Sequence, residues 1–565
     1  MNKKKAVHLT RLSSYIHSNN LENFYAGKWC DPFIKKSKNY LKYTHNNKKL
    51  NFFQMKTISF LTKKLNFYHN TKFSKSFWKI VLFPWIFLFS HVLFDRYLII
   101  RRLNKIKNVK YFLIQGSDLN KKIFDNYLQF ANNYHTDFFN NNIFFDLLKI
   151  KSSDKFKFFN SRKNFKLIEQ NNKKKLNYKK YISLFSNKNV IFFDTNLSLK
   201  KNYILYLKYF FYNNFQNLPK NKNLDLKFKN FDLKKNYSKN LNFQHILNYF
   251  SIKYLPKSYL ENFKFYKSKK LSKDLSKKPS IVVTSNSHIT DDFFKIWYGQ
   301  IKEKYKKTKL FVLQKGSEYF LKTEANTDLT YDLSDKKITW GLFNTNKKKT
   351  IFAGANLNLK YNKVLNNKKR ILYVCNEFPL YYFKNNSVSA GPNFIDHILL
   401  HENFLKNLNS EVKNNVDIKP YVIDFGWNIV NRIKKIDKRF KVIKEKNIGN
   451  LYENYDLILP ASPSTTLLES IYLNIPTITI FKQNIWQLNL KSKNIFNLLK
   501  KNNIYFDDSI KASNYINNNL DNLKRNWYSS ENQKILDIFR KNFILKNPYA
   551  PSKISNIIEK NILKN

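Results

Sequence analysis

The alternation of apolar and polar positions becomes regular at about residue 280. From there on, short apolar runs are separated by segments in which apolar residues recur every three or four positions. This pattern predicts repeated strand–loop–helix units, which build parallel sheets. The strands are expected at 280–286, 309–316, 370–375, 418–424, 440–443, 457–460 and 477–481, and the helices at 291–305, 393–408, 427–435 and from about 464 to 475.

The first half of the chain is less regular. Residues 1–105 are predicted to be mainly helical, 109–115 and 190–194 to form short strands, and 255–264 to begin a helix. The Lys/Asn-rich stretch 218–240 has no usable period and is predicted to be a solvated insertion.

The pattern also predicts how the chain divides into domains. The polar stretch 362–369 is expected to link two parallel α/β sheets, which places a ligand cleft between them. The predicted fold is therefore α/β, with two Rossmann-like domains facing a cleft and a helical N-terminal extension. Residues 1–360 form the N-terminal domain, 361–510 the C-terminal domain, and 511–565 a set of C-terminal helices.

The charge is strongly positive, but its composition argues against nucleic acid as the partner. There are 102 Lys+Arg against 39 Asp+Glu, giving +63, yet only ten of the basic residues are arginine. Nucleic-acid readers favour arginine for bidentate contacts. The overused residues Lys, Asn, Phe, Ile and Tyr share A/T-rich codons, so genome composition explains most of the charge. Weak attraction to an anionic membrane surface or a phosphorylated donor remains.

Two features bear on localisation. Cys30 and Cys375 are too few and too far apart for a disulfide framework or a zinc site, so a reducing cytoplasm is expected. The N-terminus has positive charge without an apolar core behind it, so no signal peptide is expected. Segment 80–94 is apolar but shorter than the roughly 20 residues of a membrane span. A buried core helix is its first interpretation, and peripheral contact with the inner face of the plasma membrane is the alternative.

The stretch "LILPASPSTTLLESIYLNIPTITIF", 457–481, is the most orderly in the chain. It predicts a buried strand, a loop of small and hydroxylated residues, a helix ended by Pro476, and a second strand. Thr466 and Glu469 have capping-box spacing. The first helical turn then presents free N–H groups and hydroxyls at a strand's carboxyl edge, which suits a phosphate or diphosphate. Ordinary helix capping is the competing interpretation, also for Glu469.

These motifs carry a resemblance. The segment 457–481 resembles the donor-site segment of bacterial surface-carbohydrate transferases with the two-domain GT-B fold. The chain is more specifically similar to a transferase family from surface-polysaccharide and nonulosonic-acid gene clusters. Matching pieces run in order along the chain: "GKWC" (27–30), 78–96, 255–264, "TSNSHITDDFFKIW" (284–297), "ITWG" (338–341), "NEFP" (376–379), "DFGW" (424–427) and "FKQNIWQL" (481–488).

The resemblance implies a cytoplasmic, metal-independent glycosyltransferase in surface-polysaccharide or lipopolysaccharide biosynthesis. It would move a sugar from a nucleotide-activated donor to a glycan or lipid-linked acceptor, with no tightly bound cofactor; a CMP-linked sugar is the donor suggested by the gene clusters. The chain departs from the family at two positions. Lys315 replaces the histidine of a Gln-His-Gly-Gly motif, and Ile423 replaces a histidine before the "DFGW" motif.

On the acceptor side, transfer needs a base to deprotonate a hydroxyl. The candidates are His288, just beyond a predicted strand, and Asp291 and Asp292, which open the next helix. Compensation of the helix dipole by the carboxylates, and a structural role for the histidine, are the competing interpretations.

On the donor side, hydroxyls and dipoles are needed to hold the leaving phosphate. Gly316 would either allow the backbone to approach the substrate closely or form an ordinary turn. The "DFGW" residues would either contact the donor or only pack against neighbouring residues. The predicted donor-side residues are Ser462, Ser464, Thr465, Thr466 and Glu469 (the last toward the ribose), with Asp424, Gly426, Trp427, Asn376, Glu377 and Gly391, and the predicted substrate loop is Gln314, Lys315 and Gly316.

Two rival functions stay open. Lys315 and Ile423 are compatible with a degenerate relative that binds nucleotide or glycan without turnover. Transfer of a phosphorylated polyol or another non-sugar group would use a similar anion site.

Overall fold

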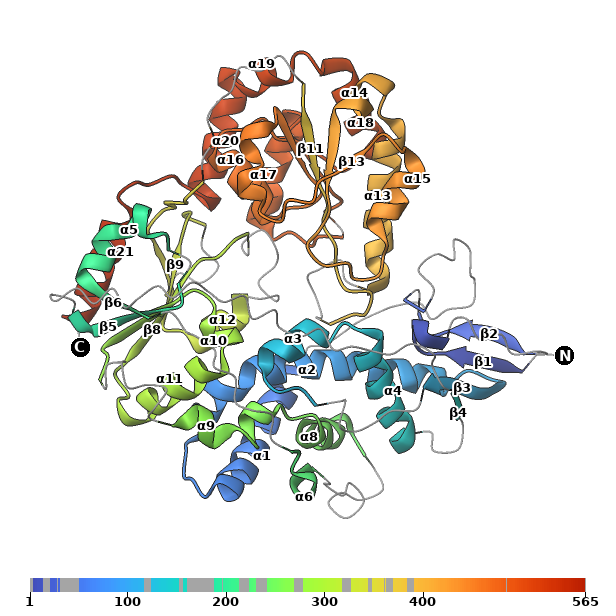
Figure 1. The fold of residues 1–565 in the computed structure, drawn as a ribbon, viewed down its shortest axis with the longest axis vertical. Helices are drawn as coiled ribbons and strands as arrows, with labels where there is room; N and C mark the ends of the chain where they lie inside the picture. Colours follow the sequence, from blue (N-terminus) through green and yellow to red (C-terminus); the bar gives the residue numbers. More distant parts are fainter. Residues whose placement is uncertain are drawn as a thin grey trace.

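Among its described residues, the computed structural model shows three larger parallel sheets joined by a helical layer, with a two-stranded sheet beside the C-terminal one (Figure 1). The C-terminal domain lies at the top of this view, a six-stranded sheet at the left, a smaller N-terminal sheet at the right, and helices between them. The structure describes residues 4–13, 21–27, 29–30, 50–115, 123–151, 156–159, 187–195, 197–212, 223–229, 241–268, 278–317, 327–343, 348–359, 361, 369–383, 391–483 and 485–563.

The C-terminal domain is built on β11 (Ile371–Val374), β12 (Val416–Lys419), β13 (Lys441–Val442) and β14 (Leu457–Pro460). All pairs are parallel, in the order β13-β12-β11-β14. A bridge between Ile458 and Thr477 leads on to β15 (Thr479–Ile480), which pairs with β16 (Tyr505–Phe506). The order of a doubly wound dinucleotide-binding sheet therefore continues across the domain.

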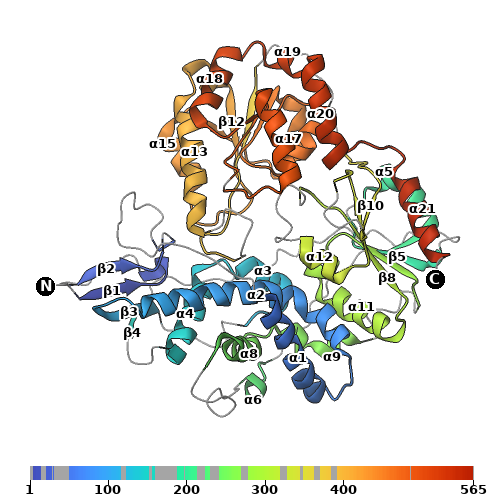
Figure 2. The ribbon, with the colours of Figure 1, turned by 180° about the vertical axis from the view of Figure 1, so that it is seen from behind.

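Helices cover both faces of this sheet (Figures 1 and 2). Their buried apolar residues, such as Phe404 and Leu405 on one side and Leu467 and Ile471 on the other, form separate core clusters. The helices are α13 (Phe394–Asn407), α14 (Ser410–Asn415), α15 (Ile429–Ile436), α16 (Thr465–Tyr472), α17 (Leu490–Lys501), α18 (Ser509–Asn519), α19 (Leu523–Trp527) and α20 (Ser530–Phe543).

The N-terminal α/β domain has a second parallel sheet in the order β10-β9-β8-β7-β5-β6. Its central strand, β7, is buried throughout, as expected for a parallel sheet covered on both faces. The elements are β5 (Asn187–Phe193), β6 (Tyr209–Tyr212), β7 (Ile281–Thr284), β8 (Lys309–Leu313), β9 (Lys336–Thr339) and β10 (Thr350–Phe352), with α5 (Leu199–Lys208), α10 (Ser287–Thr290), α11 (Asp292–Lys304) and α12 (Thr327–Leu333).

The chain returns to this domain at its end. After α20, Leu545 N donates to the carbonyl of Trp340, and Ala355 bridges Lys546. Helix α21 (Ala550–Ile562) then packs Ile554 and Ile558 into the same cluster as strands β5 and β7, beside α5 (Figure 1). The C-terminal helices therefore belong to both domains.

A helical layer carries the N-terminal part of the core. Its central member is α2 (Lys75–Leu103), capped by Ser74, and its neighbours are α1 (Leu50–His69), α3 (Tyr127–Asn133), α4 (Asp137–Lys151), α6 (Leu226–Lys229), α8 (Phe243–Lys253), a 3-10 turn at Lys257–Tyr259 and α9 (Phe263–Lys267). Among the described helices, α2 alone is long and apolar enough to cross a membrane, but 78% of its most apolar window is buried in the protein. Segment 80–94 therefore packs as a core helix.

The described part of 1–105 is mainly helical, as predicted, but it also supplies two strands to a third sheet. Strand β2 (Glu22–Tyr25) pairs in parallel with β1 (Lys5–His8), β1 pairs with β3 (Val109–Gln115), and β3 pairs with β4 (Phe156–Phe159). The sequence pattern predicts β3 but not β1 and β2, which are short polar-flanked runs; the partner that joins them to the rest of the sheet, β3, lies about a hundred residues from β1.

Other predicted elements shift. The strand predicted at 418–424 is β12, which ends at Lys419, because the apolar residues after it form an exposed loop. The helix predicted from 255 is the short 3-10 turn followed by α9. Helix α16 ends at Tyr472, before Asn474 turns the backbone with φ 58°, and not at Pro476. Most of the predicted linker 362–369, and all of 218–240 except 223–229, lie outside the described residues.

Candidate active site

The loops that follow β11 and β14 meet at the carboxyl edge of the C-terminal sheet. These two strands are neighbours where the strand order reverses, which is where open α/β sheets bind ligands. Asn376 follows β11 and Ser462 follows β14, and Asn376 Nδ2 donates a hydrogen bond to Ser462 Oγ at 2.8 Å. This hydrogen bond holds the start of the hydroxyl-rich loop in the crevice predicted for the donor.

The N-terminus of α16 continues this loop. Ser464 is the N-cap residue, but its side chain makes no capping hydrogen bond with any described residue. Some helices of the domain have a capping side chain, for example α17 with Asn489, whereas α13, α15 and α19 also lack a capping hydrogen bond among the described residues. Ser464, Thr465 and Thr466 are all partly exposed. The first turn therefore keeps N–H groups and the hydroxyls of Ser464 and Thr465 for an anion, on the positive end of the helix dipole.

Glu469 does not form the predicted capping box. Tyr452 donates its hydroxyl hydrogen to Glu469 Oε2 at 2.7 Å, and the same phenol interacts with Thr466. Burial raises the pKa of the Glu469 carboxyl. The capping prediction was wrong because Tyr452, from the preceding 3-10 turn, binds the Glu469 carboxylate. This contact also engages the carboxylate that was predicted to bind the donor ribose.

The loop after β12 contains Asp424, Gly426 and Trp427. Asp424 is exposed and accepts a hydrogen bond from Gly426 N at 2.6 Å, while Gly426 has φ +96°. Trp427 is buried and donates from Nε1 to the carbonyl of Phe378 at 2.7 Å. Asp424 is thus open to solvent, whereas Trp427 packs, in line with the competing interpretation of this motif.

Glu377 ties this loop to β11. Its Oε1 accepts a hydrogen bond from Phe425 N at 2.8 Å, and its own N–H donates to Asn376 Oδ1 at 2.8 Å. Burial, with the nearby Asp424 carboxylate, raises the pKa of Glu377 to about 8. The Glu377 carboxyl is therefore mostly neutral near pH 7, which removes one negative charge from the edge of the candidate anion site.

The N-terminal domain reaches this site through the loop after β8. Gly316 has φ +109°, and a Cβ added there would lie 2.7 Å from Thr465 Oγ1. Gln314 stabilises the loop by donating from Nε2 to the Gly316 carbonyl at 2.8 Å and accepting from Trp340 N at 2.7 Å. Lys315 between them is exposed. The predicted substrate loop and the predicted donor loop are therefore in contact across the two domains.

A cavity of about 280 Å³ lies at the carboxyl ends of β7 and β8. His288 lines it; its Nε2 lies 3.2 Å from Thr330 Oγ1, and its Nδ1 has no hydrogen-bond partner among the described residues. Burial, with Lys337 and Lys295, lowers the pKa of His288 to about 3. The other lining residues are Phe87, Leu88, Tyr127, Ala131, Tyr134, Ser285, Asn286, Ile289, Val312, Leu313, Leu329, Thr330 and Phe383.

The two aspartates predicted beside His288 have structural partners. Asp291 is the N-cap of α11 and accepts from Phe294 N at 3.1 Å. Asp292 is buried, ion-paired with Lys295 Nζ at 2.7 Å, and accepts hydrogen bonds from the Ser258 and Tyr259 hydroxyls and Tyr127 N. With these partners Asp292 joins α11 to α3 and to the 3-10 turn at Lys257–Tyr259. The base role stays a prediction that the geometry favours least for Asp292.

Sequence patterns gave little indication of a buried polar network at the domain junction. Arg11 pairs with Asp137 at 2.7 Å and donates to the Gly426 carbonyl at 3.1 Å. Arg96, wholly buried, pairs with Asp95 at 2.6 Å and donates to the Tyr382 carbonyl. The scarcity of arginine was the available signal: only ten occur in the chain, and these two lie where the domains meet.

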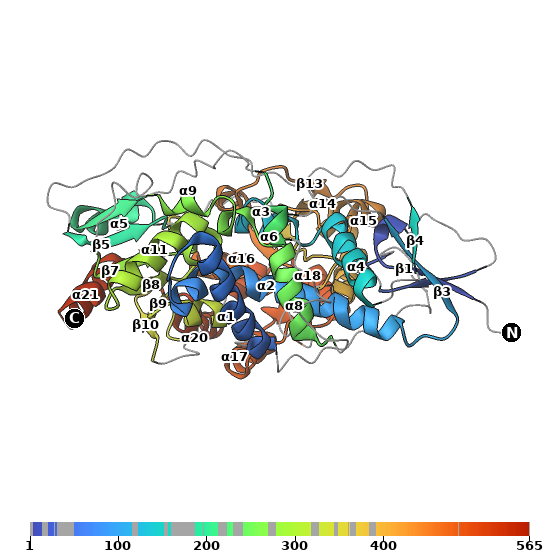
Figure 3. The ribbon, with the colours of Figure 1, turned by 90° about the horizontal axis from the view of Figure 1, so that it is seen from below.

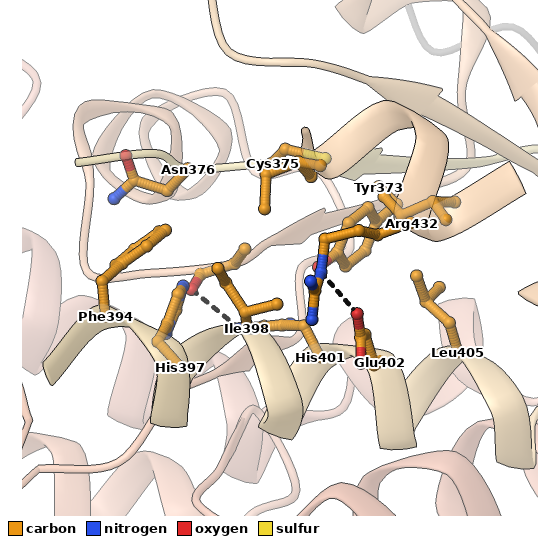
Figure 4. Close-up of a pocket in the computed structure, with 13 residues that line it drawn as sticks. Tyr373, Cys375, Asn376, Phe394, His397, Ile398, His401, Glu402, Leu405 and Arg432 are labelled. Atoms are coloured by element: carbon orange, nitrogen blue, oxygen red, sulfur yellow. Dashed lines mark hydrogen bonds and ion pairs between the residues drawn. The ribbon is translucent and has the colours of Figure 1, made fainter. Parts of the chain in front are cut away.

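Beneath the donor loop lies a smaller cavity of about 30 Å³ (Figure 4). In this view His397, His401 and Glu402 project from α13 toward the strand end that carries Asn376. His401 Nε2 lies 3.1 Å from the carbonyl oxygen of Ala461, directly before Ser462. Burial lowers the pKa of His401 to about 4, so the imidazole is neutral and donates to that carbonyl.

Gly391, the last predicted donor contact, is buried with φ +64° at the start of a 3-10 turn that leads into α13. Its N–H donates to the Pro379 carbonyl at 2.9 Å, so this amide is already used. Within the described part of the chain, no three His, Cys, Asp or Glu side chains come together as a metal site would require.

A family model matches residues 5–558 with the description LIC12162 family transferase. The chain belongs to the LIC12162 family of transferases. The match confirms the resemblance drawn from the ordered motifs, and it covers both domains. No curated protein matches the chain.

Solved structures show only distant likeness. MurG of Acinetobacter baumannii is 11% identical, with 53% of this chain and 78% of that chain covered and a TM-score of 0.30. Anabaena HepE, solved with UDP and glucose, is 12% identical, with 66% and 99% covered and a TM-score of 0.36. UDP-GlcNAc 2-epimerase of Neisseria meningitidis, bound to UDP-GlcNAc, is 13% identical, with 66% and 99% covered and a TM-score of 0.31. At this distance the comparisons carry no argument about substrate.

Proposed function

We propose that this LIC12162 family transferase moves a sugar from a nucleotide-activated donor to a surface glycan or a lipid-linked acceptor, with the donor phosphate at the N-terminus of α16. One observation carries the proposal. The uncapped first turn of α16 lies at the switch point of the C-terminal sheet, and Gly316 of the other domain closes on Thr465 there. A ligand held at this turn is in reach of both domains.

The groups around the turn suit a leaving diphosphate. The hydroxyls of Ser464 and Thr465 and the free N–H groups of the turn donate to phosphate oxygens, while Ser462 is positioned by Asn376. Lys315 supplies a mobile positive charge from the other domain. The charge that develops on the leaving phosphate during transfer would meet this set of donors, which is where an enzyme gains rate.

In this proposal the acceptor binds in the cavity beside His288. Its volume of about 280 Å³ is close to the lower end of small-ligand pockets, roughly 300–1,000 Å³, which suits a single sugar unit. The imidazole is neutral at physiological pH, and its unpartnered Nδ1 is an atom that can accept a proton from an acceptor hydroxyl. A bound anionic donor nearby would raise the pKa of His288 toward the working pH.

The identity of the donor nucleotide and its binding site can be tested directly. Thermal-shift titration of the purified protein with CMP, CDP, UDP and GDP compounds identifies the nucleotide, with CMP-linked sugars expected from the gene-cluster resemblance. Donor hydrolysis or transfer is then followed for the wild type and for Ser464→Ala/Thr465→Ala. The double variant is expected to fold normally and lose nucleotide binding by about 10-fold or more, because each hydrogen bond to a charged group contributes about 1.5–3 kcal/mol. Unchanged binding in this variant would refute the placement of the phosphate.

A second candidate function rests on Lys315 and Ile423, which stand where relatives carry histidine. In that case the protein binds nucleotide or glycan at the same turn without turnover, or it transfers a phosphorylated polyol or another non-sugar group. Tight binding with no hydrolysis or transfer from any sugar nucleotide favours the binding function. A response confined to CDP-linked polyols favours the non-sugar transferase. Cytoplasmic localisation is part of the proposal.

A further inference from the structure

The outer face of α1 is unusually apolar for an exposed surface. One side of this 20-residue helix buries Ile58, Leu61 and Leu65 in the main core. On the opposite side Phe67 is 91% exposed and Phe52 is 57% exposed. Helix α1 lies at the bottom of Figure 1, at the end of the molecule away from the C-terminal domain, and Figure 3 looks at it from below.

The exposed phenylalanines lie in line with lysines. At 3.6 residues per turn, positions 52, 56, 63 and 67 fall within an arc of about 60° and extend about 22 Å along the helix. Both lysines of this stripe, Lys56 and Lys63, are exposed, and Lys56 Nζ lies 4.3 Å from the ring centre of Phe52. The stripe thus has a phenylalanine at each end and two lysines between them, on the side opposite the buried leucines.

The surrounding sequence reinforces the positive charge. From Leu50 to Phe94 there is no aspartate or glutamate, while Lys64, Lys72 and Lys75 add exposed cations beside the stripe. The carboxylates that reach this region come from other elements. Asp225 accepts a hydrogen bond from Tyr68, near the C-terminal end of α1, and Glu303 accepts one from Ser74, the N-cap of α2.

We propose that this α1 stripe rests on the surface of an anionic lipid bilayer, with the phenylalanines in the acyl boundary and the lysines at the headgroup phosphates. Interfacial helices combine lysines with exposed phenylalanine in this way. Arginine, the residue expected for nucleic acid, does not occur between Leu50 and Phe94. The buried helix α2, whose apolar sequence suggested membrane contact, instead supports α1 from inside.

The proposal goes beyond the proposed transferase activity, because it concerns where the protein works and not what it binds at α16. Helix α2, packed on α1, also supplies Phe87 and Leu88 to the cavity beside His288. A protein held by the α1 stripe would thus present the acceptor side close to lipid-linked molecules.

The test is co-sedimentation of the full chain with vesicles of phosphatidylglycerol and phosphatidylcholine in equal parts, against vesicles of phosphatidylcholine alone, at physiological salt. Phe52→Ser/Phe67→Ser should weaken binding to the anionic vesicles by about 10-fold or more, because each phenylalanine loses apolar burial. The matched control is Leu490→Ser/Leu563→Ser, two side chains that are 76% and 86% exposed elsewhere. This control should bind like the wild type.

Charge is tested separately, because a protein of +63 is attracted to any anionic surface. Lys56→Gln/Lys63→Gln should weaken vesicle binding by about 5-fold for each lysine removed, whereas Lys501→Gln/Lys511→Gln, which removes the same charge from the C-terminal domain, should have little effect. Equal losses in the two variants would show that only net charge acts, and would overturn the proposal.

A reporter locates the contact. The emission of a tryptophan introduced by Phe67→Trp should shift to the blue and be quenched by brominated lipid, whereas Leu490→Trp should not respond beyond the wild-type background. A single-stranded RNA is titrated in parallel. Loss of RNA binding in the Lys56/Lys63 variant with unchanged vesicle binding would identify nucleic acid as the partner and refute the bilayer. Normal thermal unfolding of each variant confirms that folding is intact, and none of these measurements depends on a donor nucleotide.

Discussion

Replacing Gly316 by alanine tests whether the two domains meet at a donor site. The residue has φ +109°, a region that other residues rarely occupy, and the new Cβ would lie 2.7 Å from Thr465 Oγ1. Either Thr465 rotates its hydroxyl away from the first turn of α16, or the loop after β8 retreats. Both outcomes remove a group from the proposed phosphate site.

The expected magnitudes follow from these two effects. Unfavourable backbone at one residue costs about 1–3 kcal/mol, so Gly316→Ala should lower the free energy of unfolding by that amount. Loss of one hydrogen bond to a charged phosphate costs a further 1.5–3 kcal/mol, roughly, of binding energy. Nucleotide affinity should therefore fall by about 10- to 150-fold, beyond the loss in stability.

The chain offers a matched control in Gly354. It too has a positive φ, +95°, and a Cβ there would lie 2.5 Å from Asn547 Cβ, in contact with the C-terminal segment and not with α16. Gly354→Ala should destabilise the protein at least as much as Gly316→Ala and leave nucleotide affinity unchanged. Urea unfolding gives the stability of both variants, and calorimetric titration with the nucleotide selected by thermal shift gives the affinity.

If Gly316→Ala binds nucleotide as tightly as Gly354→Ala while both lose stability, Gly316 is only a turn glycine. The contact with Thr465 would then be a packing contact between domains, and the proposed site would have to lie elsewhere.

Three further predictions concern buried ionisable groups. Asp292→Ala should cost about 3–5 kcal/mol in urea unfolding, because Lys295 loses its buried partner; a variant that keeps wild-type stability but loses activity would instead support a catalytic Asp292. His288 has a pKa of about 3 in the folded protein and about 6.5 in the unfolded chain, so the unfolded chain is protonated first and stability should fall as the pH drops below 6.5. His288→Gln should make the urea midpoint less dependent on pH in this range. A pH profile parallel to that of the wild type would contradict this reasoning. Glu377 has its pKa raised to about 8 from 4.5, so its contribution to stability is fully present below pH 4.5 and is lost as pH rises through 8. The melting temperature of Glu377→Gln should therefore gain on that of the wild type between pH 5 and 8, and a constant difference would show that folding does not raise the pKa of Glu377.

The sequence predicted those parts of the fold that depend on local pattern. Strands β7, β8 and β11 and helices α11 and α13 lie within a few residues of their predicted positions, because each combines a periodic apolar face with a polar boundary. The sequence pattern predicts that Gly316 and Thr465 each lie in a loop that follows a strand. It does not predict that these two loops touch, because their contact depends on how the two sheets are oriented relative to each other.

The errors share a cause in long-range contacts. Thr466 and Glu469 have the spacing of a capping box, but Tyr452 lies in reach of both and takes the carboxylate. Asp292 occupies a helix start that would suit a base, but Ser258 and Tyr259 approach it from another segment. Spacing fixes which side chains share a turn and carries no information on what packs against that turn.

The two departures from the family pattern now have physical locations. Lys315 is exposed beside the contact of Gly316 with Thr465, so the position that relatives fill with histidine holds a cation next to the proposed phosphate. Ile423 is 41% exposed in the loop after β12 and has no proton to exchange. The proposed base is therefore His288, which lines the acceptor-side cavity and whose buried Nδ1 has no hydrogen-bond partner among the described residues. Loss of turnover in His288→Gln with nucleotide binding intact is therefore the result that would separate an altered catalyst from a protein that only binds.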